Sequence, residues 1–282
     1  MISIIVCNRD KSRIQPLKDN ILSTIGDVIY ELIIVDNSRN SYSIFEAYNK
    51  GVNQSSYEKL LFIHDDILFH TPKFGEVILN LKLPRLGVLG IAGAKLKTKV
   101  TSPWWITNHD QVPGGVLFQS NIQKYSNTFS QLVNFGFTYD NQIEEVLLVD
   151  GVFLYTTKEN CLHNPFDENY CSFHFYDLDF ALSMHKYRKK NYVTNAILIE
   201  HFSSGSLNKD WVEASFKYQK KWGDALSVSQ NTNKSLEKLA YESRVQILLK
   251  NKFYLKTFQY MFRFDFLSMK LFMVVFKSII RG

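Results

Sequence analysis

Short apolar segments alternate with amphipathic segments through the first third of the chain, and this alternation constrains the fold more than any other feature. The apolar segments have the length and composition of buried strands, whereas the segments between them repeat apolar residues at helical spacing. Strands that alternate with helices form parallel sheets through right-handed crossovers, so the pattern predicts an α/β fold with a mostly parallel central sheet. The predicted strands cover 2–6, 30–35, 59–63 and 86–92, and the predicted helices cover 11–24, 43–54 and 73–81.

The rest of the chain follows a less regular pattern. Residues 95–145 are punctuated by "TSPWW" and "VPGG", which predicts loops and short strands that cross a cleft. Regular structure is predicted again at 145–156, in a helix at 176–189, in a strand at 192–199, and in helices at 211–222 and 236–250. We therefore predict an α/β domain over residues 1–205 and a helical region over 206–282.

Three groups of polar residues follow the first three predicted strands. In sheets of this kind, ligands bind beyond the carboxyl ends of the strands, so we expect these groups to meet in one cleft. The groups are Cys7, Asn8 and Arg9 after the first strand, Asp36, Asn37 and Ser38 after the second, and His64, Asp65 and Asp66 after the third.

The turn after the first strand, "CNRDKSRI", contains no glycine. A dinucleotide oxidoreductase or a P-loop enzyme usually has glycines there, because bare backbone amides surround the phosphates, so the turn argues against these two classes. If the cleft binds a phosphorylated ligand, adjacent carboxylates can neutralise it only by holding a divalent cation. Asp66, together with Asp65, is the candidate for that role. The alternative for the pair is an ordinary turn or helix cap.

Taken together, the segments "SIIVCNRD", "IIVDNS" and "LLFIHDDILF" resemble the GT-A fold of nucleotide-sugar glycosyltransferases, particularly the inverting enzymes of family 2. The resemblance covers residues 1–205 and implies a Rossmann-like sheet flanked by helices, followed by a C-terminal helical extension. It implies that the first strand and turn contact the nucleobase and that the acid after the second strand contacts the base or ribose. The residues placed near the donor in this way are Cys7, Asn8, Arg9, Asp36 and Asp65.

The resemblance also implies a set of metal ligands. The usual acidic motif of the family is Asp-any-Asp, and Asp66 matches its last position, whereas His64 replaces its first acid. His201, in "ILIEHFSSGS", matches a late histidine that often binds the metal in GT-A enzymes. The implied cofactor is Mn²⁺ or Mg²⁺, and a site that contains nitrogen ligands favours Mn²⁺. A lone histidine is more often structural, which is the alternative for His201.

The segment "FHFYDLDFALSMHKYRKKNY" resembles the family's catalytic region. Asp177 matches the catalytic base, and Tyr176 stands where a glutamate is usual. A sugar hydroxyl that attacks the donor must lose its proton, so the reaction needs such a base. Asp177 and Asp179 could instead be first-turn helix residues favoured by the helix dipole, and we assign that role to Asp179. Asp150 and Gly151 match a family position near the sugar and acceptor, where the alternative is a tight bend.

The C-terminal segment 253–282 combines aromatic and aliphatic residues with regularly spaced cations. Such a segment is typical of an amphipathic helix on an anionic membrane surface, and the alternative is a helix packed on the protein's own core. Much of the formal charge of +6 lies here and not among aromatics in a groove, so we expect no nucleic-acid partner. The cations of the segment are Lys256, Arg263, Lys270, Lys277 and Arg281, and Lys252 directly precedes it.

These observations predict a metal-dependent inverting glycosyltransferase that moves a sugar from a nucleoside diphosphate sugar to a saccharide acceptor, for which a lipid-linked saccharide is a candidate. The alternative is a non-catalytic GT-A-like binding or scaffold protein, because His64 and Tyr176 replace usual acids. Three cysteines without a C-x-x-C pair fit a reducing compartment. We expect a cytoplasmic enzyme of bacterial polysaccharide synthesis, peripheral at the inner face of the cell membrane.

Overall fold

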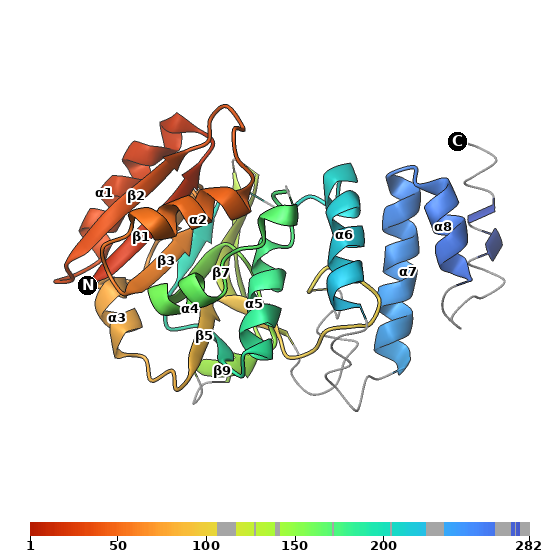
Figure 1. Cartoon of the computed structure of the whole chain (residues 1–282). Helices are drawn as coiled ribbons and strands as arrows, with labels where there is room; N and C mark the ends of the chain where they lie inside the picture. Colours follow the sequence, from red (N-terminus) through yellow and green to blue (C-terminus); the bar gives the residue numbers. More distant parts are fainter. Residues whose placement is uncertain are drawn as a thin grey trace.

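The fold is a helix-flanked α/β domain followed by a row of helices (Figure 1). The structure is a computed structural model, and it describes residues 1–105, 117–126, 128–138, 142–170, 172–203, 205–223, 234–262, 272–273 and 275–276. The segment "VPGG" and four of the predicted C-terminal cations, Arg263, Lys270, Lys277 and Arg281, lie outside these residues.

The central sheet has seven strands in the order β2-β1-β3-β11-β5-β12-β9. Strand β1 is parallel to β2 and β3, and β12 is parallel to β5, while β11 runs antiparallel between β3 and β5 and β9 is antiparallel to β12. The predicted mostly parallel sheet is therefore confirmed. The strands are β1 (Ile2–Asn8), β2 (Tyr30–Asp36), β3 (Lys59–Ile63), β5 (Leu86–Gly90), β9 (Ile143–Val146), β11 (Phe153–Thr157) and β12 (Lys190–Thr194).

Helices cover both faces of this sheet, because alternate side chains of each strand point to opposite faces. Ile4 and Val6 of β1 pack in one hydrophobic cluster with α1 and α3, whereas Ile5 and Cys7 pack in the other cluster with α2 and α5. A capping box between Ser43 and Glu46 fixes the start of α2. The helices are α1 (Ile14–Thr24), which follows the 3-10 turn η1 (Lys11–Arg13), α2 (Ile44–Gln54), α3 (Phe74–Asn80), α4 (Lys158–His163) and α5 (Tyr176–Lys186).

A second sheet lies beside the first and has the strand order β10-β6-β7-β13-β4, with β8 paired to β7. Its strands are β4 (Ile67–Phe69), β6 (Ala92–Ala94), β7 (Leu117–Ser126), β8 (Phe129–Phe135), β10 (Leu148–Val149) and β13 (Ile199–His201). The prediction of loops and short strands over 95–145 underestimated this region, since β7 has ten residues. Strand β7 is stabilised by pairing with β6 and β13, which are distant in sequence.

The predicted strand at 192–199 is wrong in its extent. The chain leaves the central sheet after Thr194 and joins the second sheet as β13 at Ile199. The predicted strand at 86–92 divides in the same way between β5 and β6. These changes of sheet carry His201 to the end of a strand that pairs with β4, directly after the His64–Asp66 turn.

Three helices follow the sheets: α6 (Lys209–Trp222), α7 (Lys234–Lys250) and α8 (Tyr254–Met261). Figure 1 shows them in a row beyond α5, away from the central sheet. Asp179 of α5 joins α6 to the domain, because its Oδ1 accepts hydrogen bonds from Trp222 Nε1 at 2.7 Å and from the Tyr170 hydroxyl, in the 3-10 turn η2 (Glu168–Tyr170), at 3.1 Å. Within the described residues, no helix has both the length and the apolar character needed to cross a bilayer.

Candidate active site

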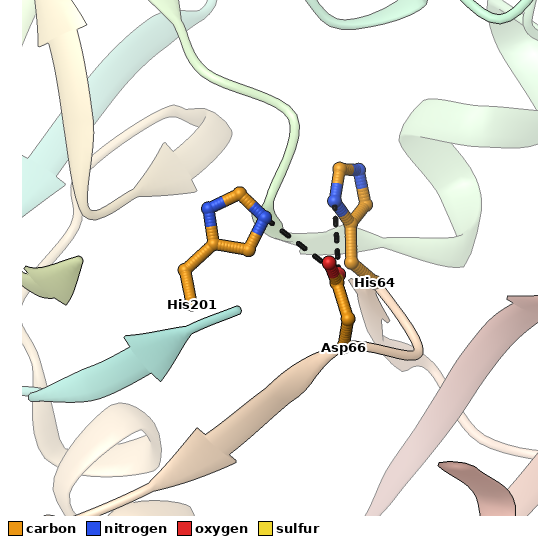
Figure 2. Close-up of side chains that lie close together, drawn as sticks. All are labelled: His64, Asp66 and His201. Carbon is orange, nitrogen blue, oxygen red and sulfur yellow. Dashed lines mark ion pairs between the residues drawn. The ribbon is translucent and has the colours of Figure 1, made fainter. Parts of the chain in front are cut away.

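Two imidazoles and one carboxylate form a compact cluster where β3 and β13 end (Figure 2). His64 and Asp66 belong to the turn between β3 and β4, and His201 is the last residue of β13. Asp66 Oδ1 lies 3.8 Å from His64 Nδ1 and 3.6 Å from His201 Nε2. One nitrogen of each ring and a carboxylate oxygen all lie within 4.8 Å of one another, a spacing that a single metal ion can span. The three predicted metal ligands therefore come together.

The carboxylate of Asp66 is buried, with only 7% of the residue exposed. Burial raises the pKa of Asp66, but His64, His201 and the Arg13 guanidinium outweigh that effect and hold the pKa below its ordinary value. The carboxylate is therefore ionised near neutral pH. Burial and the neighbouring His64 lower the pKa of His201, which favours the neutral imidazole. An ionised carboxylate and a neutral imidazole are the forms that bind metals.

Tyr176, the first residue of α5, contacts the cluster through His64. Its hydroxyl lies 2.7 Å from His64 Nε2, and this hydrogen bond orients the ring so that Nδ1 lies on the side of Asp66. His64 and Tyr176 are the two positions where the sequence departs from the acids usual in the family, and they contact each other across 112 residues of sequence. The sequence shows both departures but does not predict the contact. The one signal for it is that two positions depart from the family pattern in the same chain.

Asp65 connects the acidic turn to the turn after β1. Its Oδ2 accepts hydrogen bonds from Asn8 Nδ2 and from the Arg9 backbone N–H, both at 2.9 Å. Asn8 Nδ2 also donates to the Asp10 carbonyl. The first and third predicted groups of polar residues therefore meet, and Asp65 holds the turn in which the predicted donor-contacting residues lie.

The second group lies beside the first, because Asn8 is the register partner of Asp36 in the neighbouring strand. Asp36 is exposed and forms an ion pair with Lys11 at 3.0 Å. A hydrogen bond from the Ser38 backbone N–H, together with Lys11, lowers the pKa of Asp36 far below its ordinary value. Cys7 is buried, and Asn37 Nδ2 donates to its thiol at 3.6 Å.

Asp177 lines a cavity of about 430 Å³ together with four other predicted site residues, His64, Asp150, Gly151 and His201. Burial, and after it the charge of Asp150, raises the pKa of Asp177 to about 7. A carboxylate with this pKa can accept a proton near neutral pH and hold it in a stable form. The candidate base and the candidate metal ligands therefore face one cavity.

The peptide that presents Asp177 is held in an uncommon conformation. Phe175, two residues before it, has a φ of 69°, a left-handed conformation that is strained for a bulky residue. Position 151 requires glycine because the Tyr176 side chain packs against it: a Cβ there would lie 2.1 Å from the Tyr176 hydroxyl. Gly151 does not have a positive φ. The predicted alternative of a glycine-specific bend does not apply.

Asp150 is fixed by two hydrogen bonds. Trp104 Nε1 donates to Asp150 Oδ2 at 2.8 Å, and the Val152 backbone N–H donates to Oδ1 at 3.1 Å. Among the described residues, the cavity lining does not include Cys7, Asn8, Arg9, Asp36 or Asp65. Arg9 nevertheless reaches its border, because the guanidinium lies 4.7 Å from the ring centroid of Phe173, which lines the cavity.

Comparison with solved structures shows the fold. The GalNAc-T7 structure with UDP, GalNAc and Mn²⁺ is 8% identical with a TM-score of 0.50, covering 91% of this chain and 57% of that chain, so this chain spans little more than half of that protein. Staphylococcus aureus TarS 1–349 in complex with UDP is 14% identical with a TM-score of 0.45, covering 95% of this chain and 76% of that chain. A197 from STIV is 14% identical with a TM-score of 0.40, covering 72% and 86%, respectively.

Comparison of the sequence shows the family. No curated protein matches the chain at a significant level. A family model described as "Glycosyltransferase like family" matches residues 3–238, which is most of the chain. This match agrees with the helix-flanked sheet and with the position of the polar cavity. The protein thus belongs to this glycosyltransferase-like family and is a glycosyltransferase with the GT-A fold.

Proposed function

We propose that this protein is a metal-dependent, inverting glycosyltransferase that transfers a sugar from a nucleoside diphosphate sugar to a saccharide hydroxyl. The observation that carries the proposal is a shared cavity. His64 and His201, two members of the candidate metal cluster, line this cavity together with Asp177. A base and a cation site on one cavity supply the two things that a single displacement needs: proton removal from the acceptor and charge stabilisation on the leaving group.

The residues of the cluster fit a divalent metal ion. His64, Asp66 and His201 offer two nitrogen ligands and one anionic oxygen, a mixed set that suits Mn²⁺ better than Mg²⁺. Asp66 is ionised, and the hydrogen bond to Tyr176 orients His64 with Nδ1 on the side of Asp66. A bound ion would supply positive charge to the departing diphosphate. The three side chains hold the ion position, and the Arg13 guanidinium, 3.5 Å from Asp66 Oδ2, adds a second positive group.

Asp177 is proposed as the general base. It accepts the proton of the acceptor hydroxyl, and its pKa of about 7 lets it do so near neutral pH. One carboxylate in this role leads to a single displacement, which inverts the anomeric centre. Asp150 sits beside it, fixed by Trp104, and raises its basicity.

The donor is proposed to lie between the β1 turn and the metal cluster. Cys7, Asn8, Arg9 and Asp36 would surround the nucleoside, with Asp65 holding their turn in place. Asp150 and Gly151 would lie near the transferred sugar. Support comes from the structural neighbour GalNAc-T7, whose structure contains UDP, GalNAc and Mn²⁺.

The acceptor is proposed to be a saccharide, and two aromatic side chains support this. Trp105 and Tyr125 line the cavity and are both exposed, so their rings are available to stack on sugar rings. A lipid-linked saccharide of bacterial polysaccharide synthesis is the proposed form. It fits an enzyme peripheral to the inner face of the cell membrane.

Helix α8 supports attachment to a membrane surface. Leu255, Phe258 and Phe262 are large, exposed apolar residues at helical spacing, and Leu255 is 83% exposed. An apolar stripe on an exposed helix matches the interfacial type, with the nearby Lys256 available to anionic headgroups. We propose that residues 253–282 bind an anionic membrane in this way, while residues 1–205 carry the metal ligands and the general base.

Donor hydrolysis and transfer provide the test. The purified protein is screened with a panel of nucleoside diphosphate sugars for thermal stabilisation with and without Mn²⁺, and the stabilising donor is then assayed for release of nucleoside diphosphate. We expect stabilisation by one donor class and metal-stimulated release that Asp177→Asn suppresses. Donor binding without release of nucleoside diphosphate, and with no effect of Asp177→Asn, would instead indicate a non-catalytic scaffold. This is the alternative raised by the departures at His64 and Tyr176.

A further inference from the structure

The C-terminal helices contain a buried positive charge with no partner. Arg244 of α7 is 1% exposed, and among the residues that the structure describes its Nε and Nη1 have no hydrogen-bond partner. Across the described ranges, no carboxylate lies within ion-pair distance of it. Burial lowers the pKa of Arg244 to about 10, which still leaves the guanidinium charged at neutral pH. A buried charge without a counter-ion is costly, so its presence calls for a ligand.

Aromatic rings hold the guanidinium in place. Arg244 Cζ lies 4.9 Å from the ring centroid of Phe216, 5.6 Å from that of Trp211 and 5.9 Å from that of Tyr260. Cation–π contacts of this kind partly compensate the lost hydration and fix the plane of the group, but they leave the Nε and Nη1 donors without a hydrogen bond. The side chain is thus preorganised to donate hydrogen bonds.

Arg244 lines a cavity of about 360 Å³ between α6, α7 and α8. Lys220 of α6 and Lys256 of α8 line the same cavity, and its described lining contains no acidic residue. Lys256 Nζ lies 5.7 Å from the ring centroid of Phe216, the ring that also contacts Arg244. Three cations therefore converge on one cavity without a carboxylate to balance them.

We propose that this cavity binds a phosphate group, with the Arg244 guanidinium donating to two of its oxygens and Lys220 and Lys256 balancing its charge. Phosphate is favoured over a carboxylate because it carries up to two negative charges and enough oxygens for three cations. The site is distinct from the metal cluster, yet Trp211 lines the active-site cavity and also contacts Arg244. Trp211 thus joins the wall of the active-site cavity to the guanidinium that lines the second cavity.

Two sources can present this chemistry: a soluble phosphorylated ligand and a phospholipid headgroup. The first arm titrates the full chain with inorganic phosphate and with pyrophosphate by calorimetry, in buffer with a chelator so that the proposed metal site cannot contribute. The second arm measures sedimentation with vesicles of phosphatidylcholine alone and with added phosphatidic acid. Binding in the first arm supports the site. Vesicle binding supports it only where substitutions in the cavity weaken it, because the C-terminal segment is itself proposed to bind anionic membranes.

Substitutions assign the binding to the cavity. We expect Arg244→Met to weaken it at least about tenfold and Lys256→Gln to weaken it about threefold, since charged hydrogen bonds contribute more than distant charges. Lys250→Gln is the matched control, because it removes one exposed positive charge from the same helix outside the cavity. Lys256 is exposed, so its variant keeps the test valid even if Arg244→Met does not fold.

The proposal is overturned by either of two results. One is the absence of binding in both arms for the unchanged protein. The other is binding that Arg244→Met, folded by circular dichroism, and Lys256→Gln leave equal to that of Lys250→Gln. Neither result depends on glycosyl transfer, which is measured with metal and donor present, so failure here is distinguishable from failure of the proposed enzyme function.

Discussion

The sheet domain and the helical region each bury a charged side chain, and the two side chains have opposite surroundings. In the sheet domain, the buried carboxylate of Asp66 is surrounded by His64, His201 and Arg13. In the helical region, Arg244 is buried more completely and has aromatic rings in place of a counter-ion. The side chains around Asp66 come from the chain itself, whereas the counter-charge for Arg244 is proposed to come from a bound phosphate. Removing the charge of Asp66 should therefore weaken metal binding, whereas removing the charge of Arg244 should stabilise the fold.

The largest expected effect comes from Asp177→Asn in the sheet domain. The amide cannot accept the acceptor proton, so we expect kcat to fall about 10² to 10⁴-fold while the donor affinity stays unchanged. Initial rates and donor calorimetry measure the two quantities. Asp210→Asn, which removes an exposed acid from the first turn of α6, is the control. Retained transfer would remove Asp177 from the role of base.

The next effect is the loss of metal binding in Asp66→Asn. The variant keeps the volume of the side chain but removes the anionic ligand that His64 and His201 face, so we expect Mn²⁺ affinity to fall by about 100-fold or more. Electron paramagnetic resonance of free Mn²⁺ measures the affinity. An unchanged affinity would show that the cluster is a structural network of partners and no metal site.

A smaller loss is expected for Tyr176→Phe. Removing the hydroxyl that lies 2.7 Å from Nε2 releases the orientation of His64, and losses of this indirect kind are about tenfold in metal affinity. The same Mn²⁺ titration measures it, with Tyr155→Phe, a buried tyrosine of β11, as the control. If the two variants behave alike, the contact between Tyr176 and His64 has no role in binding.

The pH dependence tests the paired carboxylates. Asp177 must be ionised to act as base, so kcat/KM should rise with pH through about 7 and level off above it. Asp150 raises that pKa through its negative charge, so Asp150→Asn should move the rising limb to lower pH by about one unit. A pH–rate profile checks the direction, and a shift to higher pH would contradict the assignment.

The smallest effect is expected in the helical region, and its sign is opposite. Arg244→Met removes an unpaired buried charge and keeps an apolar chain among the rings, so we expect the free energy of unfolding to rise by about 1 kcal/mol. Urea unfolding without phosphate measures it. A large loss of stability would mean that the cation–π contacts outweigh the cost of burial, which would weaken the contrast between the two regions.

Much of the fold follows from local pattern. The strands β1, β2 and β3 and the helices between them were predicted with small errors at their ends, because apolar periodicity reflects the face that each segment buries. The residues after these strands follow from the same rule, since the carboxyl ends of parallel strands share one edge. His64, Asp65 and Asp66 were thus placed correctly at the end of β3.

Segments that change sheets were predicted less well. Ile199–His201 and Ala92–Ala94 are short, and no periodicity separates them from the strands that precede them. The antiparallel insertion of β11 between β3 and β5 also has no local signature. Which strand pairs with which depends on the packing of the whole sheet, and short apolar runs fit several partners equally well.

Local sequence pattern specifies an α/β chain with polar residues at the ends of its first strands, because hydrophobic periodicity and strand direction are local properties. Three features come from packing between distant segments: the contact of Tyr176 with His64, the approach of His201 to Asp66, and the burial of Arg244 with no ion-pair partner among the described residues. Contacts between residues this far apart depend on how all the layers pack together. No short segment carries that information, so the chemistry of both cavities became visible only in the folded chain.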